Sequence, residues 1–239
     1  MLWPHRIFEL MTIQKQIQIL LQRLNVACEQ NGRELGDMRV CLATKEQTPE
    51  TIREAIRASL HLCGENKAQE LVPKAKALAQ EEVVWHFIGH LQTNKVKDII
   101  EIVDTVQSVD RVALVVELQK QAARVNRHIN VYVEVNTSGE ESKHGCTPDE
   151  VNTILEAIAQ STRVHVRGFM TMGALSSDEA TVRRGFALLR SIRDRAIEEG
   201  RVPASAIELS MGMSNDMEWA IAEGSTMIRV GSAIFGSRS

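Results

Sequence analysis

The stretch Asn130-Val-Tyr-Val-Glu-Val-Asn136 is the clearest strand signal in the chain, because valine occupies every second position of it. A loop over 137–146 follows, and then Thr147-Pro148-Asp149-Glu150, which has the spacing of a capping box that starts a helix. This part of the sequence is therefore one strand followed by one helix. The same unit recurs on both sides of it along the chain.

The alternation of strands with helices determines the predicted fold. It requires a parallel sheet with crossover connections, and eight such units are the number that closes a barrel. We predict an α/β fold, a single-domain (β/α)8 TIM barrel with an extra N-terminal helix. A doubly wound open sheet competes with it, but no GxGxxG motif follows the first strand. Strands are predicted at 39–44, 60–63, 83–88, 105–109, 130–136, 164–172, 206–210 and 226–230, and helices at 15–30, from 49, at 67–80, 95–102, 111–126, from 147, at 176–200 and 216–222.

Helix starts and domain boundaries follow from local signals. Thr48 and Pro49 read as an N-cap and a first-turn proline, and Ser176-Ser177-Asp178-Glu179 reads as a second capping box. No Pro/Gly/Ser-rich linker interrupts the chain. We expect residues 1–14 to be an N-terminal extension and residues 15–239 to be the barrel domain.

Composition excludes several classes of protein. A chain of 239 residues that is 44% hydrophobic and 25% charged has the composition of a globular domain. The formal charge is only -3, without a basic stripe, so nucleic acid is not an expected partner. The longest apolar run, 112–116, is too short for a membrane span, and the N-terminus lacks a secretory signal. We therefore expect a cytoplasmic protein that does not bind membranes. The cysteines lack CxxC spacing and the histidines are scattered, so we expect reduced thiols and no metal site.

Active sites of barrels lie at the C-terminal ends of the strands, so the residues there are the candidates for function. Lys45 follows the first strand, where its amine is either a Schiff-base nucleophile or a solvated lysine. Ser210-Met-Gly-Met-Ser214 follows the seventh strand, with Ser214 as the expected N-cap of the next helix, and Gly231-Ser232 follows the eighth. Loops at these two strands bind phosphate in barrels, which we favour over a role in turns alone.

Other polar residues at strand ends leave two interpretations open. Arg229 lies in an apolar strand and needs either a partner or access to solvent. The amide of Asn66 either lies near a ring substituent of a ligand, or Asn66 forms the turn that starts the next helix. Glu134 shares one strand face with Asn136. Its side chain either points into the barrel interior or forms a salt bridge. Met172, like Met170, is expected to be core or wall.

A series of motifs, in order over about residues 15–238, resembles the pyridoxal phosphate homeostasis proteins, often called the YggS/PROSC type. Several of these motifs are too long for a chance match. They are Ala43-Thr44-Lys45, Cys63-Gly-Glu-Asn-Lys67 with Gln69-Glu70, Trp85-His-Phe-Ile-Gly-His-Leu-Gln-Thr-Asn-Lys95, Val135-Asn-Thr-Ser138 through Glu141-Ser-Lys-His-Gly145, Arg167-Gly-Phe-Met-Thr-Met172, Leu209-Ser-Met-Gly-Met-Ser214 and Ile228-Arg-Val-Gly-Ser-Ala-Ile-Phe-Gly236.

The resemblance implies a barrel similar to the N-terminal domain of alanine racemase, with pyridoxal 5'-phosphate held as a Schiff base. Two departures are small: Ala-Thr precedes the lysine where Val-Ser is common, and a serine stands at position 232 where threonine is frequent. Residues 1–11 have no counterpart. By resemblance, Lys45 forms the Schiff base, Ser214, Gly212, Met213, Gly231 and Ser232 contact the phosphate, Arg229 faces the pyridine nitrogen, and Asn66 lies near the ring.

Three functional classes are open at this point. The resemblance implies a protein that buffers or delivers the cofactor without turnover, with pyridoxal-phosphate-dependent apo-enzymes as recipients. The alternatives are a pyridoxal-phosphate-dependent amino-acid racemase and a phosphate-binding barrel enzyme without this cofactor. Racemases of this fold use a second base, a tyrosine that a partner subunit's additional domain supplies. The sequence has no such domain, and Tyr132, its single tyrosine, lies on a predicted strand. We therefore expect a non-enzyme and a monomer.

Overall fold

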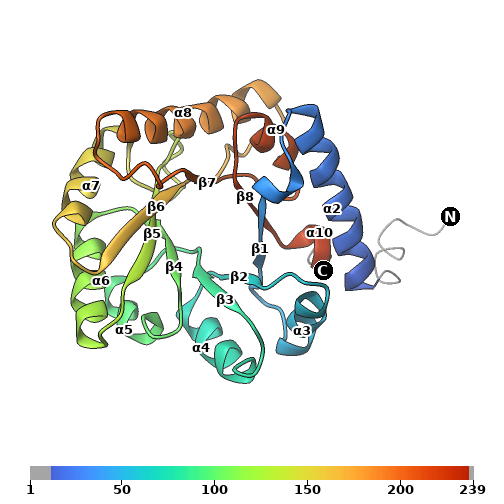
Figure 1. Ribbon diagram of the computed structural model, residues 1–239, viewed down its shortest axis with the longest axis horizontal. Helices are drawn as coiled ribbons and strands as arrows, with labels where there is room; N and C mark the ends of the chain where they lie inside the picture. Colours follow the sequence, from blue (N-terminus) through green and yellow to red (C-terminus); the bar gives the residue numbers. More distant parts are fainter. Residues whose placement is uncertain (1–11, 237–239) are drawn as a thin grey trace.

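The computed structural model describes residues 12–236 and has a closed barrel of eight parallel strands (Figure 1). The strands follow one another around the barrel in chain order, and the eighth pairs with the first. This confirms the predicted barrel and excludes the open sheet. The strands are β1 (Arg39–Ala43), β2 (Leu62–Glu65), β3 (Val84–Phe87), β4 (Thr105–Val109), β5 (Ile129–Glu134), β6 (Val164–Met170), β7 (Glu208–Ser210) and β8 (Met227–Val230).

Helices surround the barrel, and the predicted N-terminal helix lies on its outer side beside α9 and α10 (Figure 1). They are α2 (Ile13–Gln30), α3 (Pro49–Arg57), α4 (Ala68–Ala77), α5 (Val96–Ile99), α6 (Val112–Arg124), α7 (Val151–Ala159), α8 (Glu179–Glu198), α9 (Met217–Ala222) and α10 (Ser232–Phe235), with 3-10 turns η1 (Leu35–Asp37), η2 (Thr93–Lys95) and η3 (Pro148–Glu150).

Local signals for helix starts were correct at two places and wrong at a third. Thr48 caps α3, and Thr147 forms a capping box that opens η3 and leads into α7. The predicted box at Ser176 is absent. Asp178 is instead the N-cap of α8, since its carboxylate accepts the Thr181 N–H at 3.0 Å. The charged carboxylate of Asp178 is a better acceptor for the free amides of the first turn than the hydroxyl of Ser176. The helix therefore begins at Glu179, directly after Asp178.

The second strand begins later than expected because the end of α3 uses the preceding residues. Ser59 adopts a left-handed conformation with φ of 66°, and the Leu60 N–H donates to the Ala55 carbonyl. Residues 58–60 therefore close the helix, and pairing with β3 starts at Leu62.

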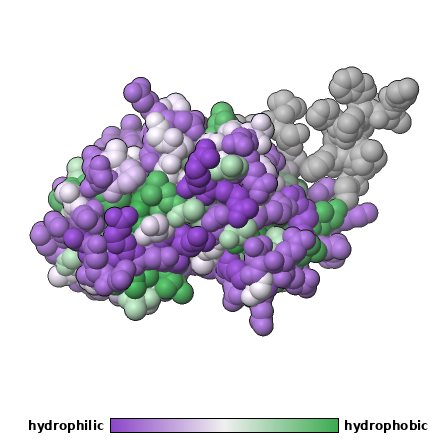
Figure 2. Space-filling model, turned by 90° about the horizontal axis from the view of Figure 1, so that it is seen from above, coloured by the Kyte–Doolittle hydropathy of each residue, from purple (hydrophilic) through white to green (hydrophobic). Residues whose placement is uncertain are grey.

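Two apolar regions stabilise the fold. The larger one, which we call the annular core, lies between the barrel and its helices and includes Leu42, Leu118, Phe169 and Phe186. The smaller one lies inside the barrel, where Cys41, Tyr132, Met170 and Met227 pack together. Met170 is thus a core residue, as expected. The face shown in Figure 2 is mainly hydrophilic, with hydrophobic side chains in separate small areas.

Within residues 12–236, no helix combines the length and the apolar character that a membrane crossing requires. The same residues contain no cluster of ligating side chains that would hold a metal ion. All four cysteines are buried and unpaired.

Candidate functional site

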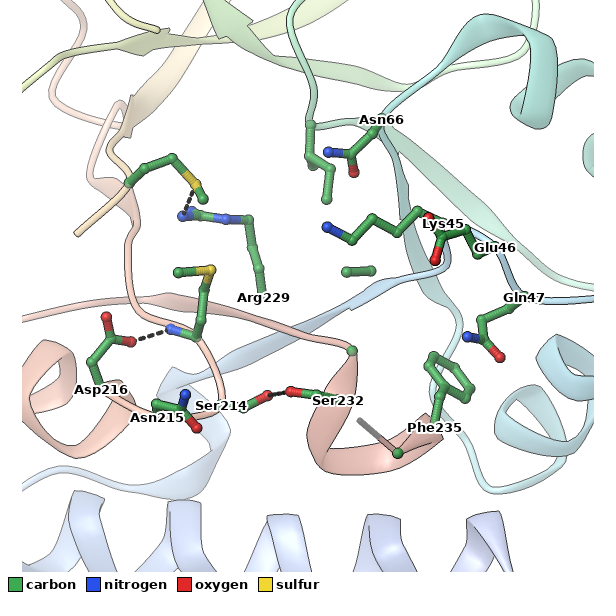
Figure 3. Close-up of a pocket in the computed structure, with 16 residues that line it drawn as sticks. Lys45, Glu46, Gln47, Asn66, Ser214, Asn215, Asp216, Arg229, Ser232 and Phe235 are labelled. Atoms are coloured by element: carbon green, nitrogen blue, oxygen red, sulfur yellow. Dashed lines mark hydrogen bonds between the residues drawn. The ribbon is translucent and has the colours of Figure 1, made fainter. Parts of the chain in front are cut away.

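A cavity of about 280 Å³ opens at the C-terminal ends of β1, β2 and β8 (Figure 3). Seven of the eight residues predicted for the site line it, although they come from four separate parts of the chain. The closing of β8 onto β1 brings the last strand and its loop next to Lys45. The residues that line the cavity are Lys45, Asn66, Met213, Ser214, Arg229, Gly231 and Ser232, with Ala43, Glu46, Gln47, Ile88, Met172, Asn215, Asp216, Phe235 and Gly236.

Gly212, the eighth predicted residue, lies beside the cavity and does not line it. Its carbonyl accepts the Arg229 N–H at 3.0 Å, and its φ is +94°. A Cβ at this position would lie 2.5 Å from the Ala220 side chain. Gly212 therefore permits the turn that brings Met213 and Ser214 to the cavity.

Lys45 extends into the cavity toward Arg229 and Asn66 (Figure 3). It stands in a turn in which the Gln47 N–H donates to the Thr44 carbonyl at 3.0 Å. The side chain is partly buried. This position fits both interpretations open from the sequence, a Schiff-base amine and a solvated lysine at the mouth of the barrel.

Arg229 is buried, and its hydrogen-bond partners are neutral: three oxygens and the sulfur of Met172. One terminal nitrogen donates to the Ser210 carbonyl and hydroxyl, both at 2.7 Å, and the other donates to the Thr171 carbonyl at 2.8 Å. Burial lowers the pKa of Arg229, while the nearby Cys41, Glu134 and Asp216 raise it. The partner that the sequence required is thus a set of backbone and hydroxyl oxygens with the Met172 sulfur, and no carboxylate of residues 12–236 forms an ion pair with Arg229.

A chain of hydrogen bonds runs from Arg229 into the barrel. The Ser210 hydroxyl accepts from Arg229 and donates to Gln107 Oε1 at 2.6 Å, and Gln107 Nε2 donates to His86 Nδ1 at 2.7 Å. A guanidinium has only donors, so every bond in the chain points away from Arg229. The chain requires neutral His86 with its proton on Nε2. Burial lowers the pKa of His86 to about 3, in agreement with this form.

The two loops expected to bind phosphate meet at Ser214 and Ser232. Their hydroxyl oxygens lie 3.2 Å apart, and Ser214 Oγ accepts the Ala233 N–H at 3.3 Å. The prediction that Ser214 is the N-cap of the following helix was wrong. α9 begins at Met217 with Asp216 at the cap position, and Asp216 Oδ1 accepts the Met213 N–H at 2.5 Å. The Ser214 hydroxyl therefore faces the second loop instead of its own helix.

Several polar atoms at the cavity have no hydrogen-bond partner in the described part of the chain. Among residues 12–236, the backbone N–H groups of Ser214, Asn215 and Ser232 have no acceptor. Asn66 Oδ1 is buried without a hydrogen bond in the same described part. Buried polar groups are normally paired, so Asn66 Oδ1 stands out, whereas Asn215 and Ser232 are exposed and their N–H groups are open to solvent or to a ligand.

Glu134 faces the barrel interior, which resolves one of the open alternatives. Burial, with the charge of Asp110, raises its pKa to about 7, and Arg229 opposes the shift. Asn136 does not continue this face: its amide donates to the Glu140 carbonyl at 2.9 Å and holds the loop after β5. Met172 lines the cavity as expected, with its sulfur 3.3 Å from Arg229 Nη2.

The sequence interpretation missed Asp216 and the residues behind Lys45. Burial raises the pKa of Asp216, against the lowering effect of the Met213 N–H. Its position three residues after Met213 was the available signal, because an acidic side chain can reach back to the backbone N–H three residues before it, as in a capping box. Lys74 and Glu65 contact the turn of Lys45 from α4 and β2. Nothing in their sequence spacing indicated this contact.

The comparisons with known proteins agree with this geometry. The model of the alanine racemase N-terminal domain family matches residues 22–239. The pyridoxal phosphate homeostasis protein of Aquifex aeolicus is 39% identical over 224 residues, which cover 94% of this chain and 97% of that protein.

Two solved structures are also similar. A protein of unknown function from Bifidobacterium adolescentis is 40% identical, with a TM-score of 0.88, over 93% of this chain and 94% of that one. PipY of Synechococcus elongatus, with PLP bound, is 29% identical, with a TM-score of 0.83, over 94% of this chain and 100% of that one. The chain belongs to the pyridoxal phosphate homeostasis protein family, within the larger family of alanine racemase N-terminal domains.

Proposed function

We propose that this chain binds pyridoxal 5'-phosphate in the cavity at Lys45 and takes part in the homeostasis of this cofactor inside the cell, as a buffer or carrier without catalytic turnover. Two comparisons support the proposal: the curated relatives are named for this function, and the similar PipY structure contains the cofactor. The observation that carries it is the convergence of an amine, a guanidinium and a set of unpaired donors on one cavity.

The residues of the cavity fit this group. Pyridoxal 5'-phosphate supplies an aldehyde that condenses with a lysine amine, and a phosphate dianion. Lys45 is the amine, and the Ser214 and Ser232 hydroxyls, with the free N–H groups of their loops, are donors for the phosphate. We assign Met213, Gly231 and the supporting Gly212 to the same phosphate site.

Arg229 and Asn66 are assigned to the ring. Arg229 directs a fixed positive charge into the cavity, so it faces the pyridine nitrogen and disfavours protonation of that nitrogen. The unpaired Asn66 Oδ1 accepts a hydrogen bond from a ring substituent.

The proposal of a non-enzyme rests on the bases that the site contains. Racemisation needs a proton donor or acceptor on each face of the substrate carbon. Within residues 12–236, Lys45 is the one amine that lines the cavity, no tyrosine or histidine lines it, and the carboxylate of Asp216 already accepts the Met213 N–H. Tyr132 is inside the barrel, and its hydroxyl donates to Glu208, the first residue of β7, at the end of the barrel opposite the cavity. Together with the charge of Arg229, this makes the site a poor catalyst of carbanion chemistry.

Incubation of L-alanine with stoichiometric cofactor-loaded protein in deuterated water tests this proposal. We expect visible absorption of the lysine-bound cofactor and no deuterium entry at Cα at an enzymatic rate. Rapid deuterium entry with accumulation of D-alanine would establish a racemase instead. A protein that never acquires the visible absorption would favour the phosphate-binding barrel enzyme without this cofactor.

Three further parts of the proposal concern the protein in the cell. We propose a cytoplasmic monomer in which residues 15–239 are the cofactor-binding domain, with apo-enzymes that depend on pyridoxal phosphate as recipients. α2 begins at Ile13, and residues 1–11 lie outside the described part. Sedimentation tests the monomer, and mixing the loaded protein with an apo-enzyme, followed by an assay of that enzyme, tests delivery.

A further inference from the structure

The turn that carries Lys45 contains a strained residue. Glu46 follows Lys45 directly and has φ of +64°, a left-handed conformation that side chains other than glycine rarely adopt. Such a conformation is strained and persists only where the surroundings hold it. The Glu46 N–H donates to Glu70 Oε2 on α4 at 2.8 Å, which is one contact that holds it.

The residue before Lys45 is held by the same helix. Lys74 of α4 is buried, and its amine donates to the Thr44 carbonyl at 2.7 Å. The same amine donates to Glu65 Oε1 at 2.5 Å and to Glu70 Oε2 at 3.2 Å. Glu70 therefore binds both the amine that holds Thr44 and the N–H of Glu46. The backbone is fixed on both sides of Lys45 by one connected set of charges.

Glu65 extends this set to the second residue assigned to the ring. Its Oε1 accepts the Thr44 hydroxyl at 2.9 Å, and its Oε2 accepts the Asn66 N–H at 3.1 Å. The carboxylate is fully buried at the end of β2, with Lys74 as its charged partner. Placing two charges in a dry position is expensive in free energy, and hydrophobic residues of similar volume would stabilise the fold as well. The pair therefore requires a reason besides stability.

We infer that Lys74, Glu65 and Glu70 are positioning residues for Lys45: they hold the strained turn so that the Lys45 amine stands ready for covalent attachment. This inference rests on the proposed function. None of the three lines the cavity, so they act through Thr44, Glu46 and Asn66. The hydrogen bond from the Glu46 N–H lowers the pKa of Glu70, which keeps that carboxylate charged at neutral pH.

Glu70→Ala is the variant that tests the inference, because Glu70 is partly exposed and its loss leaves the buried pair of Lys74 and Glu65 intact. Binding of two compounds is compared by titration. One is pyridoxal 5'-phosphate, and the other is pyridoxine 5'-phosphate, which has an alcohol in place of the aldehyde and forms no bond with a lysine. Glu117→Ala on α6 is the matched control, since Glu117 has a similar exposure and pairs with Lys120 three residues away, as Glu70 does with Lys67.

We expect Glu70→Ala to weaken binding of pyridoxal 5'-phosphate about tenfold or more, the effect of one lost hydrogen bond to a charged group. Binding of pyridoxine 5'-phosphate should stay at the wild-type value. Hydrogen exchange of the Glu46 amide should become faster in the variant, with or without a ligand. Lys74→Met, which leaves Glu65 unpaired, should produce a larger effect of the same kind if it folds, and Glu70→Ala decides the question if it does not.

Two results for the variant would overturn the inference while the proposed function stands. Equal weakening of both compounds would mean that Glu70 only supports the fold of the cavity. Unchanged binding and unchanged Glu46 exchange would mean that the turn needs no support from α4. If the wild-type protein itself forms no covalent complex while it still binds pyridoxine 5'-phosphate, the proposed function fails and the inference fails with it. That outcome is distinct from a failure of the variant alone.

Discussion

The annular core and the interior of the barrel differ in chemistry although the same eight strands form both. Outward-facing strand residues such as Val131 and Phe169 are buried against helices with apolar neighbours. The interior holds His86, Gln107 and Arg229 among a few apolar residues. Buried polar groups cost free energy unless each is paired, so an apolar interior would be the simpler way to a stable barrel. The difference indicates that the annular core holds the fold together and that the interior supports the site.

Lys45→Ala should show the largest difference between the two regions, because it should abolish covalent cofactor binding and leave stability unchanged. The side chain extends into the cavity and contributes little to either core, so the unfolding midpoint should stay near that of the wild type. The visible absorption of the bound cofactor should disappear, because no other lysine lines the cavity within residues 12–236. Covalent cofactor found after borohydride reduction of the variant would contradict the assignment of Lys45.

Leu118→Ala should lower the stability of the fold and leave cofactor binding unchanged. Leu118 is fully buried in the annular core on α6, and such truncations cost about 2–5 kcal/mol of unfolding free energy. The variant that still folds should bind pyridoxal 5'-phosphate as the wild type does. Val116→Ala on the same helix is the control, since Val116 is 59% exposed and should change stability by less than about 0.5 kcal/mol. A loss of cofactor affinity in folded Leu118→Ala would mean that the two regions are not independent.

Glu134→Gln tests the interior through pH. The folded pKa of about 7 lies above the value of 4.5 expected for an unfolded chain, so the folded state binds the extra proton between these values. Stability from this group is complete below about pH 4.5 and is lost as the pH rises to 7, by up to about 1.4 kcal/mol for each pH unit. Glutamine resembles the protonated carboxyl and has no such loss. Urea unfolding at pH 5 and pH 8 should therefore show a smaller decrease for the variant than for the wild type, and equal decreases would contradict the raised pKa.

Ser214→Ala combined with Ser232→Ala should give the smallest of these effects. The two hydroxyls are lost from the proposed phosphate site while the backbone N–H groups remain. Each hydroxyl contributes on the order of 1 kcal/mol or more to a charged acceptor, so cofactor retention in dialysis should fall while the absorption maximum stays unchanged. A shifted maximum with unchanged retention would place these serines at the ring.

The sequence was sufficient to predict the barrel, its order of strands and seven residues that line the cavity. The barrel follows from alternation along the chain, and the cavity residues stand at strand ends that the barrel brings together. The hydrogen-bond chain of His86, Gln107 and Ser210 was not predicted, because its members come from three strands and meet only through the register of the closed sheet. The Ser176 and Ser214 caps were wrong for a related reason: in each case a nearby aspartate competes for the same N–H groups, and local spacing does not determine which acceptor is used.

The one-way order of the bonds from Arg229 to His86 constrains how this interior can change during evolution. Ser210 must accept a hydrogen bond from one neighbour and donate one to the next, and Gln107 must do the same. Each of the two residues therefore fits only while the other keeps its donor and acceptor in place. Glutamate at position 107 would place an acceptor opposite His86 Nδ1 and force a proton onto that nitrogen. A substitution accepted here should therefore depend on the residues already present at the other positions, and related chains should differ at these positions as a group.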